Sequence, residues 1–292
     1  MKNEFHKGVI LTSLGSFWWG FIGVIYFEYV SFIGHVELVI HRCLWTAVML
    51  IITTSFLSKW KIFYNICCNK KNLFGLFLSG LLIFINWSIW IYAVATEKII
   101  DASFGYFIMP IISVLLGYIF FKENLNIKKI FSIILVFISI IIMIFINLKT
   151  LPWVGLIVAL SWAFYNLVRK KINVDTDVGL LIESLYILPF ALISFYFVFR
   201  SGVNDFSLSN PGFSLFLILA GPMTVIPLFL YVRGVELIGL GATGMIFYIT
   251  PTLQFILGYF YYNEEFSLVK FVSFIIIWIA VIIYLKDLYE TN

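Results

Sequence analysis

Four ionisable residues lie inside long apolar stretches of the chain, where a charged side chain is costly: His41, Arg42, Glu183 and Arg233. Arg42 could bind the carboxylate of a small molecule through two parallel hydrogen bonds, or it could bond carbonyl groups at a helix break. His41 could exchange a proton near neutral pH, or it could be a neutral histidine packed beside Trp45. Glu183 could also carry a proton, or it could form an ion pair with Arg233, which is predicted at a similar depth.

Deep polar and aromatic residues form a second group of candidates. Together with Arg42, the candidate substrate-cavity residues are Asn86, Trp90, Tyr106, Tyr165, Tyr231 and Tyr248. They lie deeper than an interfacial belt of Trp and Tyr would lie. Such rings could surround an amphipathic or cationic ligand, or they could simply pack the core of a helical bundle. Asn86 and Trp90 are four residues apart and share one helix face.

The chemistry of an enzyme is not visible in these residues. The sequence has no paired catalytic carboxylates, no metal-ligand spacing and no nucleotide-binding motif of the GxxxxGK[ST] type. We therefore expect no catalytic residue, no cofactor and no metal site.

The elements that must hold these residues are membrane-spanning helices. Hydrophobic residues make up 62% of the chain and charged residues 12%, and the mean hydropathy is +1.05. A soluble domain has about 45–50% apolar and about 25% charged residues. The apolar runs are about 20 residues long, the length of a transmembrane helix. The expected spans are roughly 8–30, 35–57, 73–95, 99–121, 127–147, 152–169, 178–199, 212–233, 239–262 and 267–285. The expected fold class is therefore an all-α integral membrane protein with ten transmembrane helices.

A short motif occurs twice with the same internal spacing, once in each half of the chain. The first copy is Pro110, Gly117, Tyr118 and Glu123, and the second is Pro251, Gly258, Tyr259 and Glu264. A proline inside a helix removes a backbone hydrogen bond and kinks the helix, so Pro110 and Pro251 are candidates for gating. The face around each proline could instead be a helix-packing seam of small residues.

The duplicated motif predicts two repeats of five helices, 1–147 and 148–292. Since each repeat has an odd number of spans, the second repeat must insert upside down. We expect Glu123 at the inner end of its helix and Glu264 at the outer end. The substrate site is then expected near the membrane midplane, between the repeats.

The distribution of charge predicts the orientation. The net charge is +4, and most of the 19 Lys and Arg residues fall on one side if the N-terminus is cytoplasmic. This asymmetry predicts that both termini are cytoplasmic. The basic loops are interpreted as topology signals, and no nucleic-acid partner is expected.

Several strings along the whole chain carry a resemblance to a known family. They are His41-Arg42 with Trp45, Asn86-Trp87, Ser103-Phe104-Gly105-Tyr106 with Pro110, Leu151-Pro152, Ser161-Trp162-Ala163-Phe164-Tyr165, Leu167-Val168-Arg169-Lys170-Lys171, and Tyr248 with Pro251-Thr252. In this set and order, the chain resembles the RarD-type branch of the EamA transporters, in the drug/metabolite transporter superfamily. It departs from the branch at Asn166, where Gly is usual, and at Phe104, where Leu is usual. Either change could alter the choice of substrate.

The resemblance implies two EamA repeats of five helices in the inner (plasma) membrane of a bacterium, and transport of small organic molecules. The expected function is secondary active or facilitative transport of a small metabolite or drug-like compound by alternating access, with an amino acid or related metabolite as one candidate. The expected partners are this substrate and the lipid bilayer, with protons as one candidate coupling ion. The protein could be a monomer or a homodimer. A channel, a non-transporting subunit and a lipid-modifying membrane enzyme are the alternatives.

Overall fold

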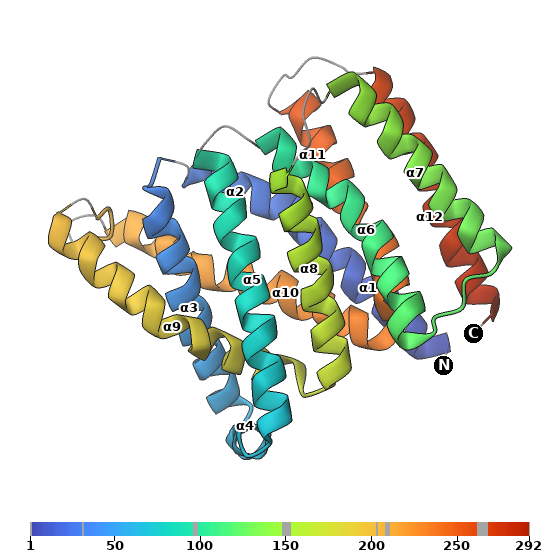
Figure 1. Cartoon of the computed structure of the whole chain (residues 1–292). Helices are drawn as coiled ribbons and strands as arrows, with labels where there is room; N and C mark the ends of the chain where they lie inside the picture. The colour runs from blue at the N-terminus through green and yellow to red at the C-terminus, as the bar shows by residue number, and fades with distance from the viewer. Residues whose placement is uncertain are drawn as a thin grey trace.

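The structure is a computed structural model that describes residues 2–30, 32–95, 99–147, 153–202, 204–207, 211–261 and 268–291. All regular structure in this part of the chain is helical (Figure 1). The helices are α1 (Lys2–Phe17), the π-helical turn η1 (Trp18–Ile22), α2 (Gly23–Tyr29), α3 (His35–Phe56), α4 (Trp60–Cys67), α5 (Lys70–Ala95), α6 (Ile99–Phe121), α7 (Ile127–Asn147), α8 (Trp153–Ile172), α9 (Thr176–Ser201), α10 (Pro211–Ile246), α11 (Ile249–Phe260) and α12 (Leu268–Thr291).

Six helical segments of the described chain are long and apolar enough to cross a membrane, judged by length and composition. They are Asn3–Tyr29, Val36–Phe56, Lys70–Trp90, Thr176–Ser201, Pro211–Phe260 and Phe271–Glu290. The expectation of an all-helical, multi-pass membrane protein is therefore confirmed. The arrangement as ten spans in two inverted repeats stays a prediction.

Three helical segments depart from regular α-helix. The π-helical turn η1 separates α1 from α2. Within α10, Gly239 has φ 87°, a backbone conformation that glycine adopts without a steric penalty, so two helical stretches meet there. A third break separates α10 from α11, which begins two residues before Pro251. Proline is tolerated in a first helical turn because its missing N–H would have no partner there. By contrast, α6 continues through Pro110.

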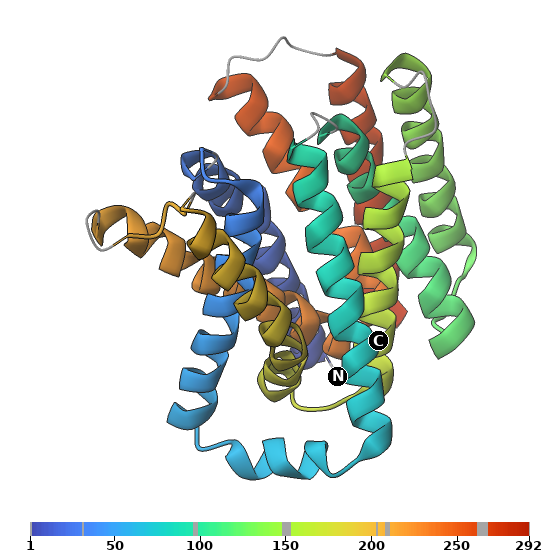
Figure 2. The same cartoon turned by 60° about the vertical axis from the view of Figure 1, so that its left-hand side comes forward.

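The helix α4 lies between two of the expected spans, 35–57 and 73–95. It runs across one end of the molecule between α3 and α5 (Figure 2). Ile66 of α4 is buried against Leu76 of α5 and against Val178 and Ile182 of α9. Its other face exposes Trp60 and Tyr64. A single buried stripe on eight residues is too short to be recognised as a helix by periodicity.

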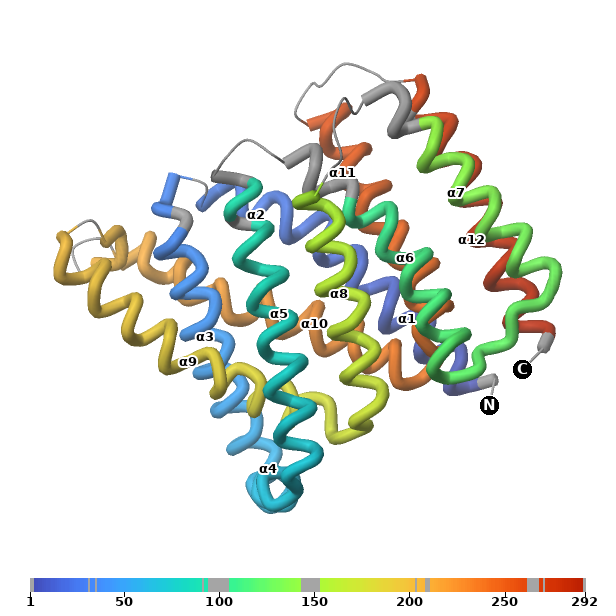
Figure 3. The backbone as a smooth tube through the Cα atoms, in the orientation of Figure 1, coloured from blue at the N-terminus to red at the C-terminus, as the bar shows by residue number. Residues whose placement is uncertain are grey.

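The longer helices pack around α10. This helix crosses the molecule behind α3, α5 and α8 (Figure 3) and contacts α1, α3, α6 and α8. The helix α8 packs against α5 and α6, and α9 packs against α3 and α5. A separate pair, α7 and α12, lies side by side at one edge, and the two chain termini lie close together (Figure 1).

Helix starts recur with the period of the duplicated motif. Three pairs of helices begin at the same separation in sequence as Pro110 and Pro251: α3 at His35 and α9 at Thr176, α5 at Lys70 and α10 at Pro211, and α7 at Ile127 and α12 at Leu268. We call two residues with this separation matched positions. Glu264 and the side chains of Ser103 and Phe104 lie outside the described residues.

Candidate functional site

Arg42 lies on α3 with its side chain buried among α2, α5 and α10. Its guanidinium sits over the ring of Trp87, 4.5 Å from the centroid, and 5.3 Å from the centroid of Phe27. Its Nε donates a hydrogen bond to Thr224 Oγ1 at 2.9 Å. Tyr106 of α6 lies within its electrostatic reach. No carboxylate of the described residues forms an ion pair with Arg42.

Next to Arg42 lies a cluster of aromatic rings, which we call the aromatic centre: Trp19, Trp90, Tyr106, Trp162, Tyr231 and Phe247. The ring centroids of Trp90 and Tyr106 are 5.3 Å apart, and those of Tyr106 and Phe247 are 5.6 Å apart. Trp19, in the π-helical turn, lies 5.2 Å from Trp162. These are normal spacings for aromatic pairs. The structure thus brings together three predicted residues, Trp90, Tyr106 and Tyr231, and Tyr106 lies within electrostatic reach of Arg42.

Glu183 lies in a separate buried site on α9. Ser79 Oγ and Tyr165 Oη donate hydrogen bonds to its carboxylate at 2.5 and 3.2 Å. Arg169 Nε lies 3.5 Å from Glu183 Oε1, and both side chains are almost fully buried. The alternative in which Glu183 pairs with Arg233 is therefore wrong, because Glu183 pairs with Arg169. Arg233 is 43% exposed and bonds Glu236 at 2.6 Å, because the two residues lie one turn apart on α10.

Two predicted cavity residues have structural partners away from the aromatic centre. Asn86 Nδ2 donates to the carbonyl oxygen of Val158 at 3.0 Å and to Ser161 Oγ at 3.1 Å, which ties α5 to α8. Tyr248 is fully buried in a second core cluster, and its hydroxyl donates to the carbonyl oxygen of Phe107 at 2.8 Å. Tyr165, through its contact with Glu183, connects the aromatic centre to the Glu183 site, since its ring stacks on Trp162.

His41 points away from Arg42. Its Nδ1 accepts a hydrogen bond from Trp45 Nε1 at 3.1 Å, and its ring packs against Phe195 and Phe206. Nε2 lies 3.5 Å from Glu37 Oε1. The Glu37 carboxylate also accepts backbone N–H groups of the segment between α9 and α10. His41 therefore takes part in a network that ties α3 to this segment.

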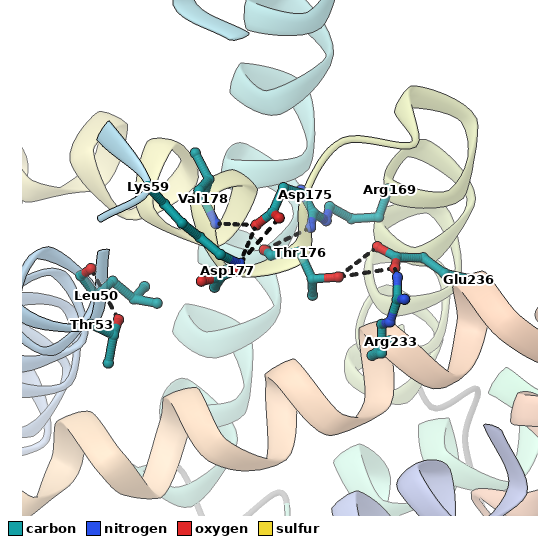
Figure 4. A network of polar contacts seen from close by, with 10 residues as sticks. All are labelled: Leu50, Thr53, Lys59, Arg169, Asp175, Thr176, Asp177, Val178, Arg233 and Glu236. Carbon is teal, nitrogen blue, oxygen red and sulfur yellow. Dashed lines mark hydrogen bonds and ion pairs between the residues drawn. The ribbon is translucent and has the colours of Figure 1, made fainter. Parts of the chain in front are cut away.

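A chain of polar contacts crosses one end of the molecule (Figure 4). We call these residues the polar belt: Lys59, Asp175, Thr176, Asp177 and Glu236. Lys59, just after α3, contacts Asp177 at 2.7 Å and Asp175 at 3.1 Å. Thr176 Oγ1 donates to both carboxylate oxygens of Glu236 on α10 at 2.9 Å. The belt joins α3 and α10 to the start of α9.

Electrostatics stabilise the exposed part of the belt. Burial alone would raise the pKa of the Asp175 carboxyl, but hydrogen bonds with Asp177 and Lys59 outweigh it and hold that pKa below its ordinary value. Burial alone would lower the pKa of Lys59, but the carboxylates of Asp177 and Asp175 raise that pKa above its ordinary value. Both charged forms are therefore favoured in the folded protein.

Glu123 makes a further contact across this end. Its carboxylate accepts the backbone N–H groups of Leu240 and Gly241 at 2.9 and 3.0 Å, and the ammonium of Lys170 at 2.7 Å. Leu240 follows the break at Gly239, so Glu123 caps the N-terminus of a new helical stretch. A carboxylate is favourable there because the first N–H groups of a helix have no intrahelical partner.

A cleft of about 430 Å³ opens beside Glu123. Its walls include Glu4 of α1, Lys170 of α8, Glu236 of α10 and Leu288 of α12. The polar belt and the Glu123 cap therefore lie at the end that carries both termini. Among the described residues, no group of three or more His, Cys, Asp or Glu is placed to hold a metal ion.

The sequence pattern did not place Arg169, Lys59 or the Glu123 cap among the candidate site residues. Arg169 adjoins Lys170 and Lys171 and was counted with the basic loops, yet its side chain is buried. A signal was present for Arg169, because Glu28 and Arg169 occupy matched positions, just as Arg42 and Glu183 do. Opposite charges thus occupy both pairs of matched positions.

The fold and the site define a multi-pass helical membrane protein with charged and aromatic residues buried between its helices. The chain belongs to the EamA-like transporter family, whose family model matches residues 6–145 and again residues 150–286.

Three curated relatives are similar over most of the chain. The uncharacterized transporter YojE of Bacillus subtilis (strain 168) is 34% identical over 284 residues, which cover 96% of this chain and 94% of the relative. Protein RarD of Escherichia coli (strain K12) is 32% identical over 286 residues, which cover 98% of this chain and 96% of the relative. The chloramphenicol-sensitive protein RarD of Pseudomonas aeruginosa (strain PAO1) is 24% identical over 251 residues, which cover 85% and 83%. The resemblance to a RarD-type EamA transporter is thereby confirmed.

A solved crystal structure at 11% sequence identity superimposes with a TM-score of 0.72. The match covers 96% of this chain and 97% of that chain. It shows a shared fold. The family and the relatives' names indicate a transporter rather than an enzyme.

Proposed function

We propose that the protein is a secondary transporter that moves a small organic molecule across the membrane by alternating access. Its ten membrane-crossing segments would form two inverted repeats, 1–147 and 148–292, with the substrate site between them. The two ranges matched by the family model, and the helix starts that recur at matched positions, support this division.

The observation that carries the proposal is the aromatic centre. Trp19 and Tyr106 come from the first matched range, and Trp162, Tyr231 and Phe247 come from the second. A site built from both repeats changes shape when the repeats move relative to each other, which is what alternating access requires. Aromatic rings also suit a substrate with an apolar body.

The polar belt and the Glu123 cap support a state in which the end with both termini is closed. They join α3 and α10 to α9, and α6 to α10, through charge-assisted hydrogen bonds. We place this end in the cytoplasm, because the majority of Lys and Arg residues are predicted there. The host membrane would be the inner membrane of a bacterium, and the protein would act as a monomer or a homodimer.

Protons are one candidate coupling ion. Glu183 is the candidate carrier, because a buried carboxylate with hydroxyl and guanidinium partners can exist in two protonation states. His41 is a second candidate, because its imidazole lies beside Glu37. A facilitator or exchanger would use neither group in this way.

The test is uptake of a labelled panel of amino acids, nucleosides and quaternary amines into proteoliposomes holding the full chain, with and without an inward proton gradient. Saturable uptake or counterflow of at least one compound is expected. Gradient-driven accumulation that is lost in Glu183→Gln while counterflow by the same variant is kept, and that is unchanged in the exposed control Glu290→Gln, would assign proton coupling to Glu183. A conductance that does not saturate would instead indicate a channel and contradict the proposal.

A further inference from the structure

The guanidinium of Arg42 is a buried charge for which the described chain supplies little compensation. Only 8% of the surface of Arg42 is exposed to solvent. Of its five N–H donors, only the Nε group has a hydrogen-bond partner among the described residues, the neutral hydroxyl of Thr224. The terminal nitrogens Nη1 and Nη2 donate no hydrogen bond to the described residues, and they therefore keep unused donors.

Arg169 provides an internal contrast, because it is the other deeply buried arginine of the described chain. Arg169 pairs with Glu183 at 3.5 Å and donates to the carbonyl oxygen of Thr176 at 3.0 Å. A buried charge without a partner is strongly unfavourable, which is why buried arginines are normally paired. Among the described residues no carboxylate forms an ion pair with Arg42, which favours an anionic ligand at this position.

The surroundings of Arg42 define the shape of that anion. Trp87 and Phe27 hold the guanidinium by cation–π contacts, and Thr224 fixes its Nε edge. Tyr106, within electrostatic reach, belongs to the aromatic centre together with Trp90. The guanidinium thus lies within electrostatic reach of a ring, Tyr106, that packs against Trp90 in the aromatic centre.

We propose that Arg42 binds the carboxylate of an organic monoanion, with the apolar or aromatic body of that molecule against Trp90 and Tyr106. This rests on the proposed function and names its substrate class. A planar guanidinium matches the two oxygens of a carboxylate. A dianionic phosphate would require a second positive charge, and no other Lys or Arg of the described chain lies over a ring of the aromatic centre.

The experiment compares acids with their neutral isosteres. Phenylacetate and phenylacetamide, and indole-3-acetate and indole-3-acetamide, are titrated against the purified full chain in detergent. Binding is measured as a shift in melting temperature and as quenching of tryptophan fluorescence. Phenethylammonium serves as the cation of similar size. The variants are Arg42→Gln and Arg42→Lys, with Lys128→Gln on the exposed face of α7 as a control that also removes one positive charge.

The wild type is expected to bind each acid about 10- to 100-fold more tightly than its amide, the usual effect of a charge-assisted hydrogen bond. In Arg42→Gln the ratio should fall to about one, and in Arg42→Lys it should be intermediate, because Lys keeps the charge but not the paired geometry. Lys128→Gln should match the wild type.

Two results would overturn the assignment: no preference for the acids in the wild type, or an unchanged preference in Arg42→Gln. If Arg42→Gln does not fold, Arg42→Lys provides the test. An unaltered ratio of acid affinity to amide affinity in a folded Arg42→Lys variant would contradict bidentate binding. Failure of the proposed function is separate. Saturable transport of neutral or cationic compounds that is insensitive to Arg42→Gln would leave a transporter with another substrate class. Binding of acids through Arg42 without transport of any compound would support the proposed binding site and contradict the proposed transport function.

Discussion

The helices α3 and α9 begin at matched positions, and each carries a buried charge seven residues after its start, Arg42 on α3 and Glu183 on α9. Glu183 has three polar partners within the described chain: Ser79, Tyr165 and Arg169. Arg42 has one neutral partner and two aromatic rings. One half of the molecule thus neutralises its own charge, whereas the other half leaves its charge for a ligand.

This difference teaches that residues at matched positions need not have matched roles. The pair Arg169–Glu183 balances the two buried charges within the second half and links α8 to α9. In the first half the signs at the two matched positions are exchanged: Glu28 occupies the position of Arg169, and Arg42 occupies the position of Glu183.

The largest expected effect is on stability, in Glu183→Gln. This change leaves Arg169 buried without a counter-charge, and removing one partner of a buried ion pair costs about 3–5 kcal/mol. The free energy of unfolding, measured by denaturant titration in detergent, should fall accordingly. The double variant Glu183→Gln with Arg169→Gln should recover part of the loss. If the single variant is as stable as the wild type, Glu183 is already neutral in the folded state and the contrast with Arg42 disappears.

Much of the fold could be predicted from apolar runs, because bilayer thickness fixes helix length. The start of α3 at His35 and the start of α6 at Ile99 coincide with the predicted span limits. Depth along two helices does not reveal which faces meet and so did not identify the partner of Glu183, whereas the opposite charges at matched positions did carry a signal for Arg169. Local hydropathy also gives no sign of the π-helical turn at Trp18–Ile22 or of the break at Gly239, since both depend on contacts with other helices.

The second expected effect is on transport, in Glu28→Gln. If the two halves exchange conformations during alternating access, the first half adopts the arrangement now seen at Arg169–Glu183. The carboxylate of Glu28 then approaches the guanidinium of Arg42, forms an ion pair with it and displaces the substrate carboxylate. We expect Glu28→Gln to slow counterflow about tenfold, the effect of one charge-assisted contact. The affinity for the substrate in the present state should be unchanged.

The matched control for this experiment is Glu290→Gln, an exposed carboxylate on α12. It should exchange substrate at the wild-type rate. Wild-type counterflow in Glu28→Gln would mean that the two halves do not exchange this contact.

A smaller effect of opposite sign is expected on stability in Arg42→Met. Replacing a buried charge that lacks a partner by an apolar side chain of similar length removes a desolvation cost, offset by the lost contact with Trp87. The free energy of unfolding without ligand should rise by about 1 kcal/mol. A loss as large as that in Glu183→Gln would show that Arg42 is satisfied within the chain.

The smallest effect concerns the polar belt and its dependence on pH. The pKa of Asp175 is lowered in the folded protein, so its contribution to stability is present above the unfolded value of about 3.9 and is lost as the pH falls through the folded value. The pKa of Lys59 is raised, so its contribution is present below the unfolded value of about 10.4 and is lost as the pH rises through the folded value.

Stability in the wild type should therefore decline at both limits of this window. Lys59→Met should flatten the alkaline decline and weaken the acid one, while costing less than about 1 kcal/mol at neutral pH, because Lys59 and Asp175 are 26% and 28% exposed and solvent screens them. Unfolding is measured in detergent at several pH values, with Lys61→Met on α4 as the exposed control. An unchanged pH profile in Lys59→Met would mean that the contacts of Thr176 and Glu236, not the charges of Lys59 and Asp175, hold this end of the molecule together.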